Sequence, residues 1–101
     1  MPFEKIAAAG SISPGEMLEF VRDERRIVVC NVEGQLHAMD GVCPHRDGPL
    51  AQGALHGRMV VCPWHAWEFD CVTGGHDFNP DLRLAKFPVE ERPDGVYLDI
   101  E

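Results

Sequence analysis

The chain has 101 residues, of which 9 are Lys or Arg and 17 are Asp or Glu, so its formal charge at pH 7 is −8. This length suits one compact domain, and a composition of 45% hydrophobic and 26% charged residues is typical of a globular protein with a core. The acidic charge excludes nucleic acid as an expected partner, because phosphate binding requires an excess of Lys and Arg, and it favours cationic protein surfaces instead.

The sequence carries no pattern typical of a targeting signal or a membrane span. Glu4 places an acid early in the chain, and the longest apolar runs, such as 27–30, are far shorter than the roughly 20 residues that cross a bilayer. We therefore expect a cytoplasmic protein that makes no membrane contact and whose thiols stay reduced. The four cysteines then require an explanation other than disulfides.

Strand signals dominate the chain. Short runs rich in Val, Ile, Leu and aromatic residues alternate with Gly, Pro and Asp turns, which is the pattern of an all-β sandwich or barrel, and no long segment has a helical period. Glu33-Gly34 and Arg92-Pro93-Asp94-Gly95 have the turn residues of two hairpins. In chain order, the pattern predicts strands over 3–7, 17–21, 26–32, 35–39, 84–90 and 96–100.

The middle of the chain, 40–80, is an irregular insert that holds three of the four Cys and four of the five His. Two mixed pairs stand out, Cys43-Pro44-His45 and Cys62-Pro63-Trp64-His65, with sixteen residues between them. Four nitrogen and sulfur ligands in two pairs predict a metal site in a reducing compartment. The spacing leaves two interpretations open: one tetrahedral zinc ion, or a two-iron cluster with both Cys on one iron and both His on the other.

The residues around these pairs closely resemble the Rieske [2Fe-2S] family, and the resemblance covers nearly the whole chain. It is carried by Cys43-Pro44-His45-Arg46-Asp47-Gly48-Pro49-Leu50, Val61-Cys62-Pro63-Trp64-His65-Ala66-Trp67-Glu68-Phe69-Asp70 and Thr73-Gly74. It implies an all-β Rieske-type fold of stacked antiparallel sheets: one domain over 1–101, with a small cluster-binding loop subdomain at about 41–80. It also implies one [2Fe-2S] cluster, with Cys43 and Cys62 on the inner iron and His45 and His65 on the outer iron through Nδ1.

Four further residues are candidates for supporting the cluster or docking a partner. Arg46 follows the predicted ligand His45, and two tryptophans lie on either side of the predicted ligand His65. A proline matches in position the loop that covers the cluster in the family. Each also has a purely structural interpretation, as a solvated cation, a core residue or a turn. The four are Arg46, Trp64, Trp67 and Pro80.

Two departures from the respiratory and photosynthetic Rieske proteins predict a low reduction potential. Those proteins carry an additional Cys in each loop, whereas this chain has Trp64 in the second loop and no thiol over 46–48 in the first. They also place Ser and Tyr hydroxyls where this chain has Trp67 and Phe69. Fewer hydrogen bonds to sulfur stabilise the reduced cluster less, so we expect a midpoint near roughly −150 mV, the low end of the Rieske range.

We expect neither the catalytic domain of an oxygenase subunit nor a membrane anchor in these 101 residues, and within the family the chain resembles the ferredoxins of bacterial aromatic-ring dioxygenase systems. The resemblance implies a monomer that is not an enzyme and that passes single electrons from a flavin-dependent reductase to a terminal oxygenase. The alternative is the small Rieske-like subunit of assimilatory nitrite reductase. A zinc-stabilised interaction module is the remote alternative.

The remaining cysteines and histidines have no ligand spacing to the two pairs. We expect Cys30 to be a buried small hydrophobe without a redox role, and Cys71 to pack beneath the cluster loop without being a ligand. We expect His37, His56 and His76 to lie at the surface or in turns.

Overall fold

Antiparallel strands make up most of the backbone in the computed structural model, which describes residues 3–44, 48–64, 67–79 and 81–100. Helical structure in these segments is limited to one 3-10 turn, η1 (Leu50–Gln52). The all-β prediction is therefore confirmed. The strands are β1 (Phe3–Ala7), β2 (Met17–Arg22), β3 (Arg25–Val32), β4 (Gln35–Asp40), β5 (Ala54–His56), β6 (Met59–Val61), β7 (Glu68–Asp70), β8 (Lys86–Phe87), β9 (Val89–Arg92) and β10 (Gly95–Asp99).

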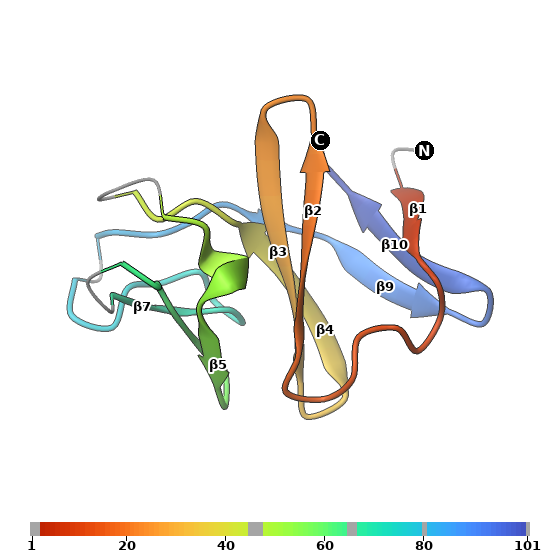
Figure 1. Ribbon diagram of the computed structural model, residues 1–101, viewed down its shortest axis with the longest axis horizontal. Coiled ribbons are helices and arrows are strands. Elements are labelled where there is room, and N and C mark those ends of the chain that lie inside the picture. Colours follow the sequence, from red (N-terminus) through yellow and green to blue (C-terminus); the bar gives the residue numbers. More distant parts are fainter. Residues whose placement is uncertain (1–2, 45–47, 65–66, 80, 101) are drawn as a thin grey trace.

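The strands form three antiparallel sheets, with orders β1-β10-β9, β2-β3-β4-β8 and β5-β6-β7. In Figure 1, β5 and β7 lie at the left end of the molecule, β1, β9 and β10 lie at the right end, and β2, β3 and β4 stand between them. The small sheet formed by the middle of the chain is thus set apart from the terminal strands. Among the described residues, no helix has the length and apolar character needed to cross a membrane.

The hairpin between β3 and β4 has the predicted turn. Glu33 and Gly34 have φ values of 53° and 93°, so both adopt the left-handed conformation of a two-residue turn that matches strand twist. Asn31, which is 5% exposed, accepts a hydrogen bond from the Gly34 N–H at 2.8 Å and donates one to the Ile12 carbonyl at 2.8 Å. A buried amide therefore joins the hairpin to the segment that precedes β2.

The strand predicted over 84–90 is wrong in one respect: Pro88 divides it into β8 and β9. Strand β8 pairs with β4, whereas β9 pairs with β10 in a different sheet. Proline has no N–H to donate to a ladder, and the Pro88 carbonyl instead accepts the Asp99 N–H at 3.0 Å. The chain changes sheets at this proline.

The Cys- and His-rich insert, which the sequence predicts to be irregular, contains the sheet β5-β6-β7. Its strands are three residues long. Strands this short have no room for the alternation of apolar and polar residues by which longer strands are found. The predicted loops therefore extend from a small sheet of their own.

Strand β3 separates two hydrophobic cores, because its side chains are buried on both faces. Val28 and Cys30 face one core, and Ile27 and Val29 face the other. The first core joins β3 and β4 to the small sheet and contains all four cysteines of the chain: Cys30, Cys43, Cys62 and Cys71. The second joins β3 and β4 to β10.

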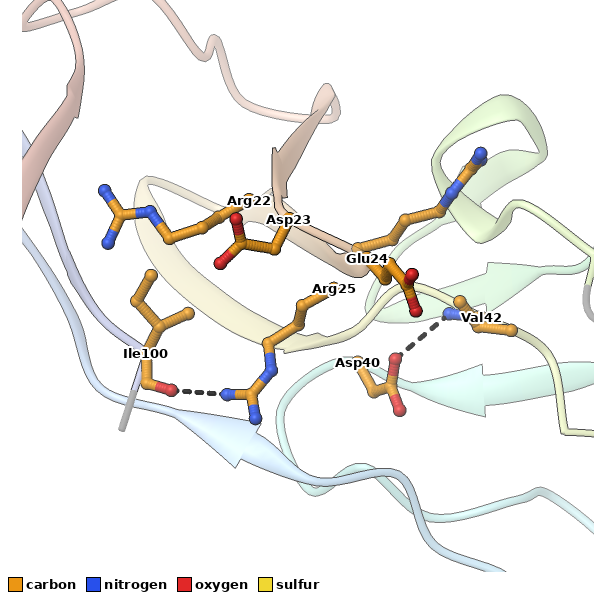
Figure 2. A pocket seen from close by; sticks show the side chains of 8 residues that line it. Arg22, Asp23, Glu24, Arg25, Asp40, Val42 and Ile100 are labelled. Atoms are coloured by element: carbon orange, nitrogen blue, oxygen red, sulfur yellow. Dashed lines mark hydrogen bonds between the residues drawn. The ribbon is translucent and has the colours of Figure 1, made fainter.

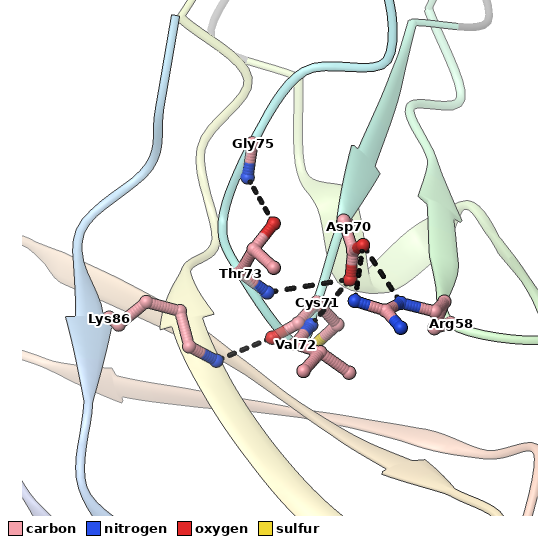
Figure 3. Close-up of polar contacts among 7 residues, drawn as sticks. All are labelled: Arg58, Asp70, Cys71, Val72, Thr73, Gly75 and Lys86. Carbon is pink, nitrogen blue, oxygen red and sulfur yellow. Dashed lines mark hydrogen bonds and ion pairs between the residues drawn. The ribbon is translucent and has the colours of Figure 1, made fainter. Parts of the chain in front are cut away.

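Asp70 organises the turn that follows β7 (Figure 3). Its carboxylate accepts the N–H groups of Val72 at 2.8 Å and Thr73 at 3.4 Å, and it pairs with the Arg58 guanidinium at 2.8 Å. Burial by itself would raise the pKa of Asp70, but the hydrogen bonds from Arg58 and from the two amides outweigh burial and lower that pKa. The folded state therefore stabilises the ionised carboxylate.

We expect Asp70→Asn to lower the free energy of unfolding at pH 7 by about 1 kcal/mol, a small value because the Arg58 side chain is half exposed. Because the folded-state pKa of Asp70 lies below the unfolded value, its contribution is complete above about pH 4 and is lost as the pH falls through the folded-state pKa. Unfolding curves of the two proteins should differ at pH 7 and converge at acid pH. An equal difference at both pH values would show that the substitution acts through packing instead.

Candidate metal centre

Cys43 lies at the start of a loop that closes on itself. Val42 forms an isolated bridge with Pro49, and the Cys43 N–H donates to the Gly48 carbonyl at 2.9 Å. The side chain of Cys43 is fully buried in the first core. The loop therefore turns a thiol inward, toward the small sheet.

Cys62 follows β6 and begins the second loop. Its N–H donates to the Trp67 carbonyl at 2.7 Å, and its Sγ accepts the Trp64 N–H at 3.4 Å. Cys62 is 1% exposed. A backbone N–H directed at a buried sulfur stabilises negative charge on it, which is the state in which a cysteine binds a metal.

The two cysteines meet between the loops. Cys43 and Cys62 are buried in the same core, and the Cys43 thiol is near enough to that of Cys62 to shift its pKa. Gly48 of the first loop lies against the sulfur of the second, since a Cβ built on it would be 2.8 Å from Cys62 Sγ. Burial raises the pKa of Cys62 and the neighbouring Cys43 raises it further, while the Trp64 N–H opposes both. Two adjacent thiols in a dry site fit a metal centre, because a bound metal ion would take both as thiolates.

The predicted ligands His45 and His65 lie outside the described residues, as do Arg46 and Pro80. Within the described segments, no group of three or more His, Cys, Asp or Glu side chains could hold a metal ion, so the site consists there of the two cysteines. This donor set of two sulfurs fits one iron of a two-iron cluster whose other iron has ligands of a different kind. The predictions for the four undescribed residues stay predictions.

We expect Gly48→Ala to reduce the amount of cluster bound, because the new methyl group would lie 2.8 Å from Cys62 Sγ and displace it. Gly57→Ala is the matched control, since Gly57 has a φ of 64° but nothing lies within 4 Å of the position that its Cβ would take. The control should be strained by about 1 kcal/mol and keep its cluster. Iron content and visible absorption of the purified proteins measure the difference. Equal occupancy in both variants would contradict close contact between the loops.

The two tryptophans flank this site in different ways. Trp64 is 49% exposed. Trp67 is half-buried and packs against the core that contains Cys43 and Cys62. The first presents an apolar surface to solvent, and the second covers the apolar side of the thiol pair.

His76 is a residue whose environment the sequence did not indicate. Its side chain is 6% exposed, and its ring centroid lies 4.7 Å from that of Trp67 and 5.1 Å from that of Phe69. Nδ1 accepts the N–H groups of Phe78 at 3.1 Å and Asn79 at 3.2 Å, so the neutral ring carries its proton on Nε2. The prediction of a surface or turn histidine is wrong for this side chain, which supports the loop from inside.

A cavity of about 740 Å³ lies away from the thiol pair, at the turn between β2 and β3 (Figure 2). Arg25 donates to the Ile100 carbonyl, and Asp40, whose pKa burial raises, accepts the Val42 N–H at 3.3 Å. Three arginines and three acidic residues line this cavity, so the cavity has no excess charge that would select a charged ligand. The charged lining residues are Arg22, Asp23, Glu24, Arg25, Arg26 and Asp40.

Residues 3–88 match the Rieske [2Fe-2S] domain family. The chain belongs to this family. Membership decides between the two interpretations of the Cys/His pairs: the cofactor is one Rieske-type [2Fe-2S] cluster, not a zinc ion. The paired cysteines at the end of the small sheet are consistent with that centre.

Similar proteins of nearly the same length are ferredoxin components of oxygenase systems. The chain is 36% identical to the biphenyl 2,3-dioxygenase ferredoxin component of Rhodococcus jostii, covering 100% of this chain and 95% of that protein. It is 33% identical to the naphthalene 1,2-dioxygenase ferredoxin component of Pseudomonas putida, covering 92% and 90%. It is also 33% identical to the alkene monooxygenase ferredoxin component of Xanthobacter autotrophicus, covering 95% and 80%.

Solved structures of Rieske ferredoxins have the same fold. A chain from a complex of reduced oxygenase and oxidized ferredoxin in carbazole 1,9a-dioxygenase superposes with a TM-score of 0.90 at 29% identity, covering 99% of this chain and 94% of that one. The predicted Rieske-type fold of antiparallel sheets is therefore confirmed.

Proposed function

We propose that this chain is a single Rieske domain over 1–101 that acts as a cytoplasmic, monomeric electron carrier and is not itself an enzyme. It receives one electron at a time from a flavin-dependent reductase and delivers it to a terminal oxygenase that acts on aromatic rings. The observation that carries this proposal is similarity over almost the full length of ferredoxin components whose oxygenases act on biphenyl and naphthalene.

Four residues are proposed as the cluster ligands. Cys43 and Cys62 would hold the inner iron, and the proximity of their buried thiols supports this assignment. His45 and His65, which follow these cysteines by two and three residues in the sequence, would hold the outer iron. When bound, the cluster supplies a one-electron redox couple.

The residues around the cysteines exclude water and present a surface for docking. Phe69 is fully buried and Trp67 is half-buried in the core that contains both thiols, so solvent does not reach the sulfurs from that side. Trp64 lies two residues after Cys62 and is 49% exposed, which suits an apolar contact with a partner close to the centre. Electron transfer requires such proximity and no substrate cavity.

Reconstitution tests this proposal. The purified protein, with its cluster, replaces the native ferredoxin in a mixture of the biphenyl dioxygenase reductase and oxygenase components, and NADH-dependent hydroxylation of biphenyl is measured. We expect turnover that requires this chain and that is absent when it is omitted. No transfer to this oxygenase or to that of naphthalene dioxygenase, together with stable binding to a large nitrite reductase subunit, would favour the alternative function.

We expect electron delivery to slow as salt is added, because a chain of net charge −8 would be attracted to a cationic partner over a Debye length of about 8 Å at physiological ionic strength. Asp77 and Asp81 lie on the loop that follows His76, beside the site, and are exposed. The double change Asp77→Asn and Asp81→Asn should lower the low-salt rate several-fold. Asp94→Asn, in the β9–β10 turn at the other end of the molecule, is the control, and a rate that salt leaves unchanged would contradict steering.

A further inference from the structure

Two cysteines that the cluster does not use lie against each other in the first core. Cys30 is on β3 and Cys71 directly follows β7, so 40 intervening residues separate them in sequence, 31–70. Both side chains are 0% exposed and belong to the same core, and each thiol shifts the pKa of the other. His37 of β4 is the register partner of Cys30 and also contacts Cys71, so it places the two cysteines side by side. The Cys71 Sγ also lies 3.6 Å from the His37 carbonyl oxygen, to which its S–H donates. The fold thus brings together two thiols that no sequence spacing connects.

A cation stands beside this pair. Lys86 of β8 is exposed, and its Nζ donates to the Cys71 carbonyl (Figure 3). The Cys71 N–H donates in turn to the carbonyl of Arg58, in the turn before β6, at 2.8 Å, so the backbone of Cys71 is held on both sides. Lys86 therefore lies near both thiols and favours negative charge on either sulfur.

The two sulfurs differ in acidity. The hydrogen bond from the Cys30 thiol lowers the pKa of Cys71, and Lys86 lowers it further against the opposing effect of burial. The same hydrogen bond, together with burial, raises the pKa of Cys30. An acidic thiol beside a thiol that keeps its proton is the arrangement of an attacking and a resolving cysteine.

Solvent comes close to the pair on one side. A surface cavity of about 590 Å³ has His37, Arg58 and Val72 in its wall. The His37 carbonyl accepts the Cys71 thiol, the Arg58 carbonyl accepts the Cys71 N–H, and Val72 is the next residue in the chain. One layer of residues therefore separates Cys71 from a space that admits small molecules.

We propose that Cys30 and Cys71 are a redox-active pair that hydrogen peroxide converts to a disulfide while the cluster stays in place. The Cys71 thiolate attacks one peroxide oxygen, the O–O bond breaks and, with one proton taken up, water leaves, giving Cys71 sulfenic acid. The Cys30 thiol then displaces the sulfenic oxygen as a second water and forms the S–S bond. In sum, two thiols lose two electrons and two protons to peroxide, and two waters are formed.

The bond would add a covalent link between two parts of the fold that now contact each other through packing and a few hydrogen bonds. Cys30 belongs to the central sheet β2-β3-β4-β8, and Cys71 directly follows β7 of the small sheet, the strand that comes after the Cys62 loop. A covalent link here would resist separation of the two sheets when peroxide is present. This proposal is independent of the redox partners proposed above.

Treatment of the cluster-containing protein with hydrogen peroxide, followed by alkylation and peptide mass mapping, tests the proposal. We expect a linked pair of peptides containing Cys30 and Cys71, lighter than the reduced pair by two hydrogen atoms, with the visible absorption of the cluster retained. The melting temperature should rise on oxidation and return with dithiothreitol. The Cys30→Ser variant should retain the cluster and form no link. It should accumulate Cys71 sulfenic acid, which a sulfenic-acid-reactive nucleophile detects. The Cys71→Ser variant should form neither the disulfide nor the sulfenic acid.

Three results would overturn the proposal. One is bleaching of the cluster before any link forms, and another is a link that joins only Cys43 and Cys62. The third is accumulation of Cys71 sulfenic acid to the same level in the wild type and in a Cys30→Ala variant with intact cluster absorption, since that would show that Cys30 does not resolve it.

Discussion

Cys62→Ala is expected to abolish cluster binding and with it the visible absorption of the protein. Cys62 is 1% exposed, its Sγ accepts the Trp64 N–H, and its thiol lies near that of Cys43, so the substitution removes one of the two sulfurs of the site. Because metal binding and local folding are coupled, the loops beside β6 and β7 should also lose protection from proteolysis. Iron analysis, absorption spectra and limited proteolysis measure these effects. His65→Ala should have the same consequence if the proposed ligand set is correct.

Cys71→Ala is the matched control for this loss. Cys71 is a buried cysteine of the same core, but it lies against Cys30 rather than against the Cys43–Cys62 pair. The variant should be less stable and keep the full spectrum, since the cavity left by one sulfur is small. Cluster loss in Cys71→Ala together with retention in Cys62→Ala would reverse the proposed assignment.

Phe69→Tyr is expected to raise the midpoint potential by about 40 mV above the wild-type value, which we predict to be roughly −150 mV. Phe69 is 0% exposed, pairs with Val60 of β6 and lies in the core that contains Cys43 and Cys62. A hydroxyl on this ring would donate toward a cluster sulfur, and a hydrogen bond that favours the reduced state by about 1 kcal/mol corresponds to about 40 mV for one electron. Protein-film voltammetry measures the shift.

Phe87→Tyr provides the control, because Phe87 packs against the second core on β8, away from the cysteines. Its midpoint should equal that of the wild type. Iron content must be measured as well, since an added hydroxyl in a filled core costs stability. An unchanged midpoint in fully loaded Phe69→Tyr would mean that the hydroxyl does not reach sulfur, and a wild-type midpoint above about +100 mV would contradict the low-potential prediction itself.

The strand framework could be predicted from the sequence where turn chemistry and alternation agree. Glu33-Gly34 joins the predicted pair of strands, and the strand predicted over 3–7 has those bounds in the structure. The prediction over 84–90 failed because apolar residues continue on both sides of Pro88, although the chain changes sheets there. Periodicity reports which residues are buried and not which sheet they join.

The candidate site could be predicted from the sequence only because its Cys and His residues have the spacing of metal ligands. Cys43 and Cys62 stand in pairs that indicate a metal, whereas Cys30 and Cys71 meet only because β3 packs beneath the small sheet. The burial of His76 likewise depends on rings from Trp67 and Phe69 that fold around it. Contacts of this kind arise from tertiary packing and leave no local pattern in the sequence.

The most direct test of a Rieske-type one-electron carrier is a redox titration followed by electron paramagnetic resonance. We predict that reduction produces one unpaired spin per chain, with an average g value of about 1.9 as expected for mixed His and Cys ligation, and a midpoint near roughly −150 mV. A reduced protein that gives no paramagnetic signal, or a signal of a cluster ligated by Cys alone, would contradict the assignment of Cys43, His45, Cys62 and His65 and the function built on it.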